Sequence, residues 1–134
     1  MKKTFFLLIS VIIIVLSCKS EEKEQIVVAD FSGKWQFKTR VLIYTPGGKP
    51  NQKYTINDGA IFTFGVDSSF KSSKFNCEGH YSYESNILTI NLPCDPLFIN
   101  KKYNFQFAGA NELHLDPQII ECDEGCYYIL EKIR

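Results

Sequence analysis

The residues of this chain best suited to chemistry are its five cysteines and two histidines. Cys77, Glu78 and His80 place a thiol, a carboxylate and an imidazole close together, as nucleophilic catalysis would require. In an extended strand, however, Cys77 and His80 project from opposite faces, because side chains alternate with a period of two. A disulfide at Cys77 would also consume the nucleophile. The sequence has no phosphate-binding glycine loop and no Gly-x-Ser-x-Gly motif, so it predicts a protein that is not an enzyme.

Residue types that bind metals do not form a recognisable metal site. His80 and His114 lie in separate segments, and we expect each to be an ordinary strand residue. A group of acidic residues lies near Pro117 and Gly125: Asp116, Glu121, Asp123 and Glu124. It lacks the spacing of an EF-hand loop, which favours a solvated loop over a weak calcium site. The sequence therefore predicts no metal and no cofactor.

The chain opens on an apolar segment. Lys2 and Lys3 precede residues 4–16, which are almost entirely phenylalanine, leucine, isoleucine and valine. As a helix this segment would be about 20 Å long, short of the roughly 20 residues that a bilayer core requires. Its length, position and flanks are typical of a signal peptide over residues 1–17, with a short uncleaved anchor as the alternative.

The apolar segment ends in Val15-Leu16-Ser17-Cys18, which resembles the lipobox of bacterial lipoproteins. The resemblance implies cleavage after Ser17 and acylation of Cys18, with palmitate among its acyl chains, although Leu16 is bulkier than the small residue often found there. Two or three acyl chains would hold a soluble domain on a membrane, because each buried CH₂ contributes about 0.8 kcal/mol. Residues 18–29 are then the lipidated cysteine and a flexible polar tether.

The first residues of the tether indicate the membrane to which the protein is sent. Ser20 after Lys19 resembles the pattern of lipoproteins sent to the outer membrane, and a lysine followed by acidic residues resembles a surface-export signal of Bacteroidetes lipoproteins. A plain polar linker is the alternative. We expect a lipid-anchored protein of the cell envelope that lies at the outer membrane, on either its periplasmic or its surface face.

The other four cysteines suit an exported domain. Even in number, they predict two disulfides with three connectivities, whereas a zinc site usually shows two close pairs of cysteines. A two-residue turn at Ser85-Asn86 would pair two flanking strands so that Cys77 faces Cys94. A three-residue turn with Gly125 at a position of positive φ would place Cys122 against Cys126. We therefore favour Cys77–Cys94 and Cys122–Cys126.

Residues 30–134 show the period-two alternation of strands and no helical periodicity. The expected inward face of the first strand consists of Phe31, Gly33, Trp35, Phe37, Thr39, Val41 and Ile43. About eight short antiparallel strands follow one another through tight turns, and the last runs from about Cys126 to Ile133. This spacing predicts one all-β domain, a sandwich or a closed barrel, and closure would remove exposed sheet edges.

The run Phe-Ser-Gly-Lys-Trp at 31–35 resembles the Gly-x-Trp signature that opens the first strand of lipocalins. Segments 79–83, 88–90 and 112–115 look like the small lipocalin-like lipoproteins of Bacteroidetes. The resemblance implies an eight-stranded antiparallel up-and-down barrel over residues 30–134. It also implies a late cation packed over Trp35, a role open to Lys132 or Arg134.

Aromatic residues facing inward would either fill such a barrel or form the wall of a ligand site. The candidate ligand-binding residues are Trp35, Phe37, Phe62, Phe64, Tyr103 and Phe105. The first functional hypothesis is a small apolar ligand bound in the barrel mouth. The second is an envelope protein partner, met by the loops of an inhibitor or a surface-complex subunit. Equal numbers of basic and acidic residues argue against a nucleic-acid partner.

Overall fold

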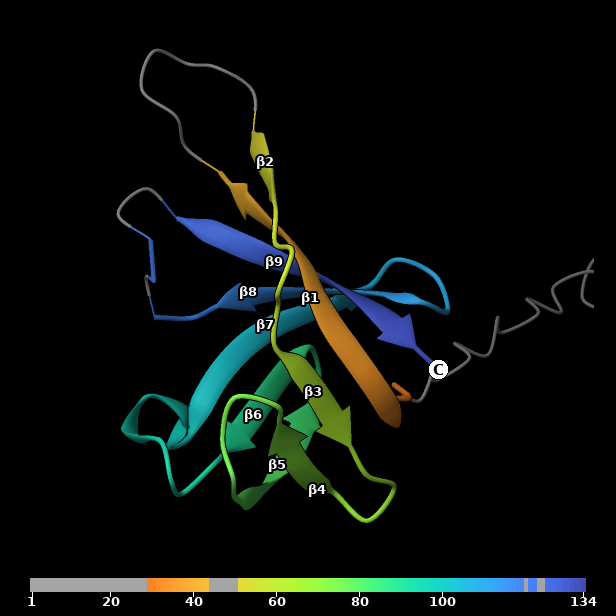
Figure 1. The fold of residues 1–134 in the computed structure, drawn as a ribbon, viewed down its shortest axis with the longest axis vertical. Coiled ribbons are helices and arrows are strands. Elements are labelled where there is room, and N and C mark those ends of the chain that lie inside the picture. Colours follow the sequence, from red (N-terminus) through yellow and green to blue (C-terminus); the bar gives the residue numbers. More distant parts are fainter. Residues whose placement is uncertain (1–28, 44–50, 120, 123–124) are drawn as a thin grey trace, which may run out of the picture.

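The computed structural model describes residues 29–43, 51–119, 121–122 and 125–134. These residues form nine strands: β1 (Gly33–Leu42), β2 (Gln52–Thr55), β3 (Ile61–Phe64), β4 (Ser69–Ser72), β5 (Glu78–Glu84), β6 (Ile87–Asn91), β7 (Lys101–Phe107), β8 (Glu112–Pro117) and β9 (Cys126–Ile133). The only helix in this part of the chain is the single 3₁₀ turn η1 (Pro96–Phe98) (Figure 1). The expected signal peptide (1–17), Cys18 and the tether up to residue 28 lie outside the described residues.

The strands close into a barrel. Neighbours along the chain from β3 to β9 pair antiparallel, and β1 pairs with β3 on one edge and with β9 on the other. Strands β1 and β3–β9 thus form a closed eight-stranded up-and-down barrel, which confirms the predicted fold class. β2 pairs with residues 39–42 of β1 and extends the wall beyond β3, which pairs with residues 33–36 (Figure 1).

A β-bulge at Lys38 corrects the predicted face of the first strand. Phe37 pairs with Leu130 and Thr39 pairs with Ile129, so Lys38 has no partner of its own on β9. Because the extra residue shifts the alternation by one, the strand changes face at this point. Trp35 and Phe37 face the interior as predicted, whereas Thr39 and Val41 face outward. Val41 is nevertheless buried, outside the main core cluster.

The register of the β5–β6 hairpin agrees with the prediction. Glu84 pairs with Ile87 across the turn, and the pairing continues outward to His80 and Asn91. Ser85 adopts φ 55°, a conformation that a tight two-residue hairpin turn requires. Beyond the last paired residues the same register leads to Cys77 and Cys94.

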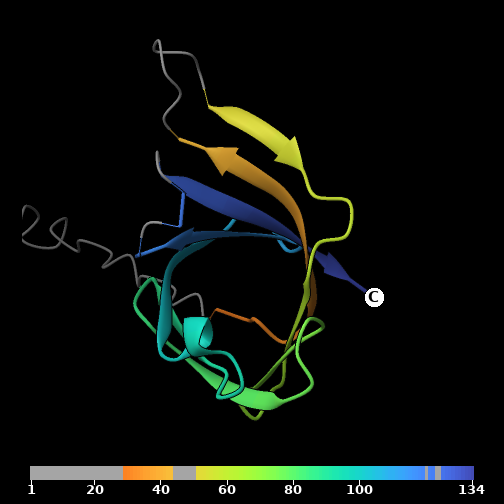
Figure 2. The same cartoon turned by 60° about the vertical axis from the view of Figure 1, so that its left-hand side comes forward.

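The two ends of the barrel differ. One end carries the turns 65–68, 85–86 and 108–111 together with segment 29–32, and we call it the closed end. Phe31 of that segment is buried there, with its ring centroid 4.8 Å from that of Phe105 and 5.1 Å from that of Phe107. Figure 2 shows segment 29–32, in orange, running across the space that the strands enclose. The other end carries the connections after β4, β6 and β8, and we call it the open end.

Candidate functional site

The open end holds a cavity of about 820 Å³. This volume is within the range of small-molecule sites, about 300–1,000 Å³. Its wall combines strand residues from inside the barrel with residues of the open-end connections. The lining is Phe37, Ile56, Asp58, Gly59, Ala60, Phe62, Ser72, Lys74, Phe75, Asp95, Leu97, Phe98, Lys101, Tyr103, Ile119, Glu121 and Tyr128.

Aromatic rings form a continuous part of this wall. Phe37 stands between Tyr128 and Phe62, with ring centroids 5.3 and 4.7 Å away. Phe62 continues to Phe98 at 5.9 Å, and Phe98 continues to Phe75 at 6.2 Å. These edge-to-face arrangements are favourable for aromatic pairs and hold the wall in place. The wall therefore offers a preformed apolar surface.

Both disulfides lie at the open end. Cys77–Cys94 joins the connection after β4 to the connection after β6, with a Cα–Cα distance of 6.2 Å. It thereby ties the segment of Phe75 to the segment of Phe98. Cys122–Cys126 closes the turn before β9, where Gly125 has the expected positive φ of 78°. Both predicted pairings are confirmed.

A polar cluster interrupts the apolar wall. Lys101, the first residue of β7, forms an ion pair with Glu121 from the connection between β8 and β9. Their side chains are 10% and 26% exposed. The Tyr128 hydroxyl of β9 donates a hydrogen bond to Glu121 Oε2 at 3.0 Å. Lys101 Nζ also lies 5.9 Å from the centroid of the Tyr103 ring. We call Lys101, Glu121 and Tyr128 the mouth cluster.

Burial affects the titration of the phenols in this wall. It raises the pKa of Tyr128 to about 12, helped by the negative charge of Glu121 and by the hydrogen bond to it. Burial also raises the pKa of Tyr103, which is 2% exposed, far above its ordinary value. Both phenols are therefore protonated at neutral pH, and the Tyr128 hydroxyl stays a hydrogen-bond donor.

Three of the six candidate ligand-binding residues line the cavity, namely Phe37, Phe62 and Tyr103. The other three, Trp35, Phe64 and Phe105, belong to the packed closed end and are absent from the cavity lining. Trp35 is fully buried and Phe64 is 1% exposed. The barrel is thus filled at one end and open at the other, so the two alternatives drawn from the sequence each describe one half of it.

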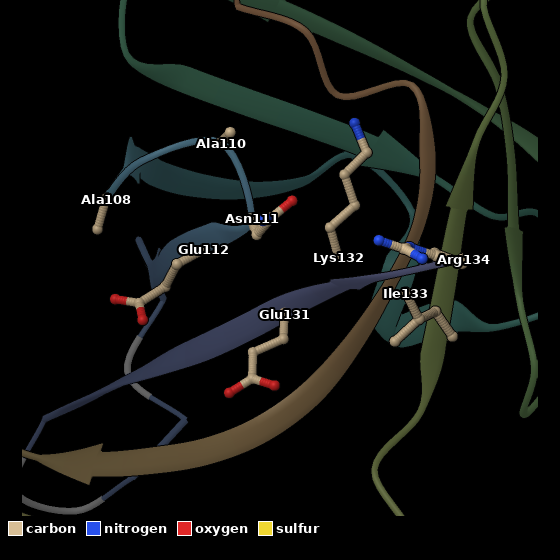
Figure 3. A pocket seen from close by; sticks show the side chains of 8 residues that line it. All are labelled: Ala108, Ala110, Asn111, Glu112, Glu131, Lys132, Ile133 and Arg134. Atoms are coloured by element: carbon tan, nitrogen blue, oxygen red, sulfur yellow. The ribbon is translucent and has the colours of Figure 1, made fainter.

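Lys132 is the cation that covers Trp35. It pairs with Trp35 across β1 and β9, and its Nζ lies 5.2 Å from the ring centroid. In Figure 3 the Lys132 and Glu131 side chains leave β9 on opposite sides, as the alternation of a strand requires. Arg134, the other candidate, instead contributes with both of them to an open groove of about 710 Å³ outside the closed end.

The sequence did not identify several residues of the cavity. The mouth cluster joins residues of β7 and β9 to the connection after β8, and no local motif marks such a contact. Leu97 and Phe98 lie in a segment with two prolines, and such a segment predicts a loop without indicating that it lines the interior. The sequence does indicate that Tyr128 faces the interior, because Tyr128 and Leu130 are two positions apart in the last strand and therefore share a face.

Several of the remaining candidates for catalysis or metal binding are in contact with another side chain. Cys77 is in a disulfide, and His80 lies in β5 within 3.5 Å of the Asn91 side chain. His114 lies in β8, and its Nε2 is 2.6 Å from Glu112 Oε1. Glu121, from the expected acidic loop, points to Lys101, whereas Asp123 and Glu124 lie outside the described residues.

Within the described ranges, His, Cys, Asp and Glu side chains form no group of three or more that could hold a metal ion. No helix in the part of the chain that the structure describes is long and apolar enough to cross a membrane. Comparison of the chain with models of protein families, with curated proteins and with solved structures found no significant match.

Proposed function

We propose that this protein is a lipocalin-like lipoprotein, anchored to the cell envelope through Cys18, that binds a small apolar ligand at the open end of its barrel. The observation that carries the proposal is the asymmetry of the interior. The closed end is packed with side chains, whereas the open end retains about 820 Å³ behind an aromatic wall. A cavity of this size and lining suits a small molecule with a large apolar surface.

The proposed location rests on the chain's N-terminal sequence and on its cysteines. The run Val15-Leu16-Ser17-Cys18 fits acylation, and the polar residues after it fit a tether. Two disulfides suit a compartment outside the reducing cytosol. We place the protein at the outer membrane, on its periplasmic or surface side.

Native mass spectrometry tests ligand binding. The chain from residue 18 with Cys18→Ser, produced in an oxidising compartment, avoids detergent and keeps every strand of the barrel. We expect a small molecule to copurify with it, or an uncharged fluorescent probe such as N-phenyl-1-naphthylamine to bind it. Ala60→Phe should abolish binding by filling the cavity, because Ala60 lines it. Thr63→Phe, which adds the same ring to the outward face of β3, is the matched control.

Ligand binding would be refuted if neither a copurifying molecule nor probe binding is found. Binding in the open-end cavity would be refuted if Ala60→Phe binds the ligand as tightly as Thr63→Phe and the unsubstituted chain do. Both variants must first give the circular dichroism spectrum of the folded barrel.

A protein partner at the same end is the second candidate function. The exposed apolar residues Leu97, Ile99 and Ile119 favour it, with 76%, 53% and 69% of their surfaces accessible. A photo-crosslinking amino acid at position 97 in intact cells should then give one defined protein adduct. The same group at Val66, which is exposed at the closed end, should give none. Equal labelling from both positions would contradict this function.

A further inference from the structure

We propose that the ligand of the open end is amphipathic and electrically neutral, with a hydroxyl or amide group that binds the mouth cluster and an apolar part that lies against the aromatic wall. This inference rests on the proposed function and names the chemical class of the ligand. The relevant observation is an ion pair, Lys101 with Glu121, built into the wall of a mainly apolar cavity.

The pair can hydrogen-bond a ligand without being broken. An ammonium has three donors and a carboxylate has about four acceptor positions. The contact between Lys101 and Glu121 uses one of each, and the Tyr128 hydroxyl uses one further carboxylate position. A hydroxyl or amide can therefore donate to Glu121 and accept from Lys101 together. A purely apolar molecule would remove water from these groups without replacing its hydrogen bonds, which is unfavourable.

Charged ligands meet repulsion as well as attraction. The charges of Lys101 and Glu121 balance each other, so a carboxylate that approaches the lysine also approaches the glutamate. An ammonium meets the opposite arrangement. Such repulsion is weakly screened beside an apolar wall, where the effective dielectric constant is low.

The other charged residues of the cavity do not add net positive charge that would favour an anionic ligand. Asp95 is buried and its Oδ1 accepts the backbone N–H of Leu97 at 3.0 Å. Lys74 Nζ lies 3.3 Å from the backbone oxygen of Asp58, whose own side chain is exposed at the rim. Among the described lining residues two lysines face three carboxylates, so an anionic ligand finds no excess of positive charge.

Three probes with the same alkyl chain test the inference: decanol, decanoate and decylammonium at neutral pH. Each is titrated by calorimetry into the chain from residue 18 with Cys18→Ser. We expect decanol to bind at least tenfold more tightly than either ion. The equal chain length keeps the apolar contact constant, so the ratio reports on the polar end alone.

Two substitutions should redirect this preference. Glu121→Gln leaves Lys101 without its anion, and we expect decanoate to become the tightest of the three probes. Lys101→Met leaves Glu121 without its cation, and we expect decylammonium to become the tightest. Lys102→Met and Glu131→Gln are the matched controls, because both residues are exposed on the outer face. These control variants should keep the preference for decanol.

The possible outcomes distinguish a wrong ligand class from a failure of the proposed ligand binding itself. Tightest binding of decanoate or decylammonium to the unsubstituted cavity would overturn the inference while supporting ligand binding. Binding of none of the three probes would count against both. A preference that Lys102→Met alters as strongly as Lys101→Met would place the polar contact elsewhere and overturn the inference.

Discussion

Lys132 lies over the ring of Trp35 at the closed end, with its Nζ 5.2 Å from the ring centroid. The indole Nε1–H of Trp35 donates a hydrogen bond to the backbone oxygen of Phe31 at 2.7 Å. The tryptophan thus joins three elements, namely its own strand β1, the last strand β9 and segment 29–32. Because its apolar surface is buried and its N–H is bonded, it stabilises the closed end without an unsatisfied polar group.

Replacing Trp35 with alanine should strongly destabilise the barrel. The substitution removes a fully buried side chain and leaves a cavity, which costs about 3–5 kcal/mol of unfolding free energy. Urea denaturation followed by circular dichroism measures the change. Lys132→Met, which keeps the covering stem and removes the charge, should cost about 0.5–2 kcal/mol. A midpoint for Trp35→Ala close to that of the unsubstituted protein would contradict the structural role of Trp35.

Gly33→Ala should destabilise the protein for two reasons. Gly33 has φ +111°, where side chains are strained, and an added Cβ would lie 3.1 Å from Lys132 Cε. Gly109→Ala is the matched control, because Gly109 has φ +96° but no atom within 4 Å of an added Cβ. Backbone strain alone should cost about 1–3 kcal/mol at each site. In urea melts Gly33→Ala should therefore show the larger loss, and equal losses would mean that crowding against Lys132 contributes nothing.

The fold was predictable where local patterns determine it. Alternation located the strands, the turn at Ser85-Asn86 set the β5–β6 register, and that register placed Cys77 opposite Cys94. The glycine at position 125 marked the second disulfide turn in the same way. Each of these features depends on residues close in the chain, so the sequence is sufficient to predict them.

The bulge at Lys38 and the mouth cluster were not predictable in this way. The bulge interrupts a regular alternation that continues unchanged in the residue types from Phe37 to Val41, so the pattern itself gives no warning. The contact of Lys101 with Glu121 depends on the course of the connection after β8, which runs back beside the start of β7 beyond the last pair of the β7–β8 register, Tyr103 with Pro117. Only half of the candidate ligand-binding residues line the cavity, because inward alternation identifies the interior without telling which end is open.

Acylation of Cys18 is a prediction from the sequence alone. Cells fed an alkyne analogue of palmitate should label the protein, and Cys18→Ala should lose the label and leave the detergent phase in a partition assay. A variant without the Cys77 and Cys94 pair is the control, and it should keep the label because those residues form a disulfide. Label that persists in Cys18→Ala would show that another residue carries the acyl chains.

Tyr128 should make the barrel sensitive to alkaline pH. Burial raises its pKa to about 12, above the value of about 10 in an unfolded chain. Because the protonated phenol is favoured in the folded state, its contribution to stability is complete below about pH 10 and is lost as pH rises toward 12. Between about pH 10 and 12, Tyr128→Phe should lose less unfolding free energy than the unsubstituted protein, as measured by urea denaturation. The difference should be about 1 kcal/mol or less, because Tyr128 is partly exposed to solvent.

The neighbouring Tyr127 supplies the control for this pH dependence. Tyr127 alternates with Tyr128 and faces outward, so Tyr127→Phe should keep the full pH dependence. Tyr103 is present in all three proteins and adds a fall of the same sign to each. Identical slopes for Tyr128→Phe and the unsubstituted protein would contradict the prediction.

The two disulfides should differ in what they stabilise. Loop-closure entropy grows with loop length, so Cys77–Cys94, with a separation of 17 residues, should contribute about 3 kcal/mol and Cys122–Cys126, with a separation of 4, about 2 kcal/mol. Double alanine variants of each pair, compared in urea melts, measure the difference. The longer bridge, Cys77–Cys94, also ties together the segments of Phe75 and Phe98 at the cavity. Removal of this bridge should therefore weaken binding of N-phenyl-1-naphthylamine even under conditions in which the variant is fully folded. Unchanged probe binding in the folded variant would show that the aromatic wall keeps its arrangement without the bridge.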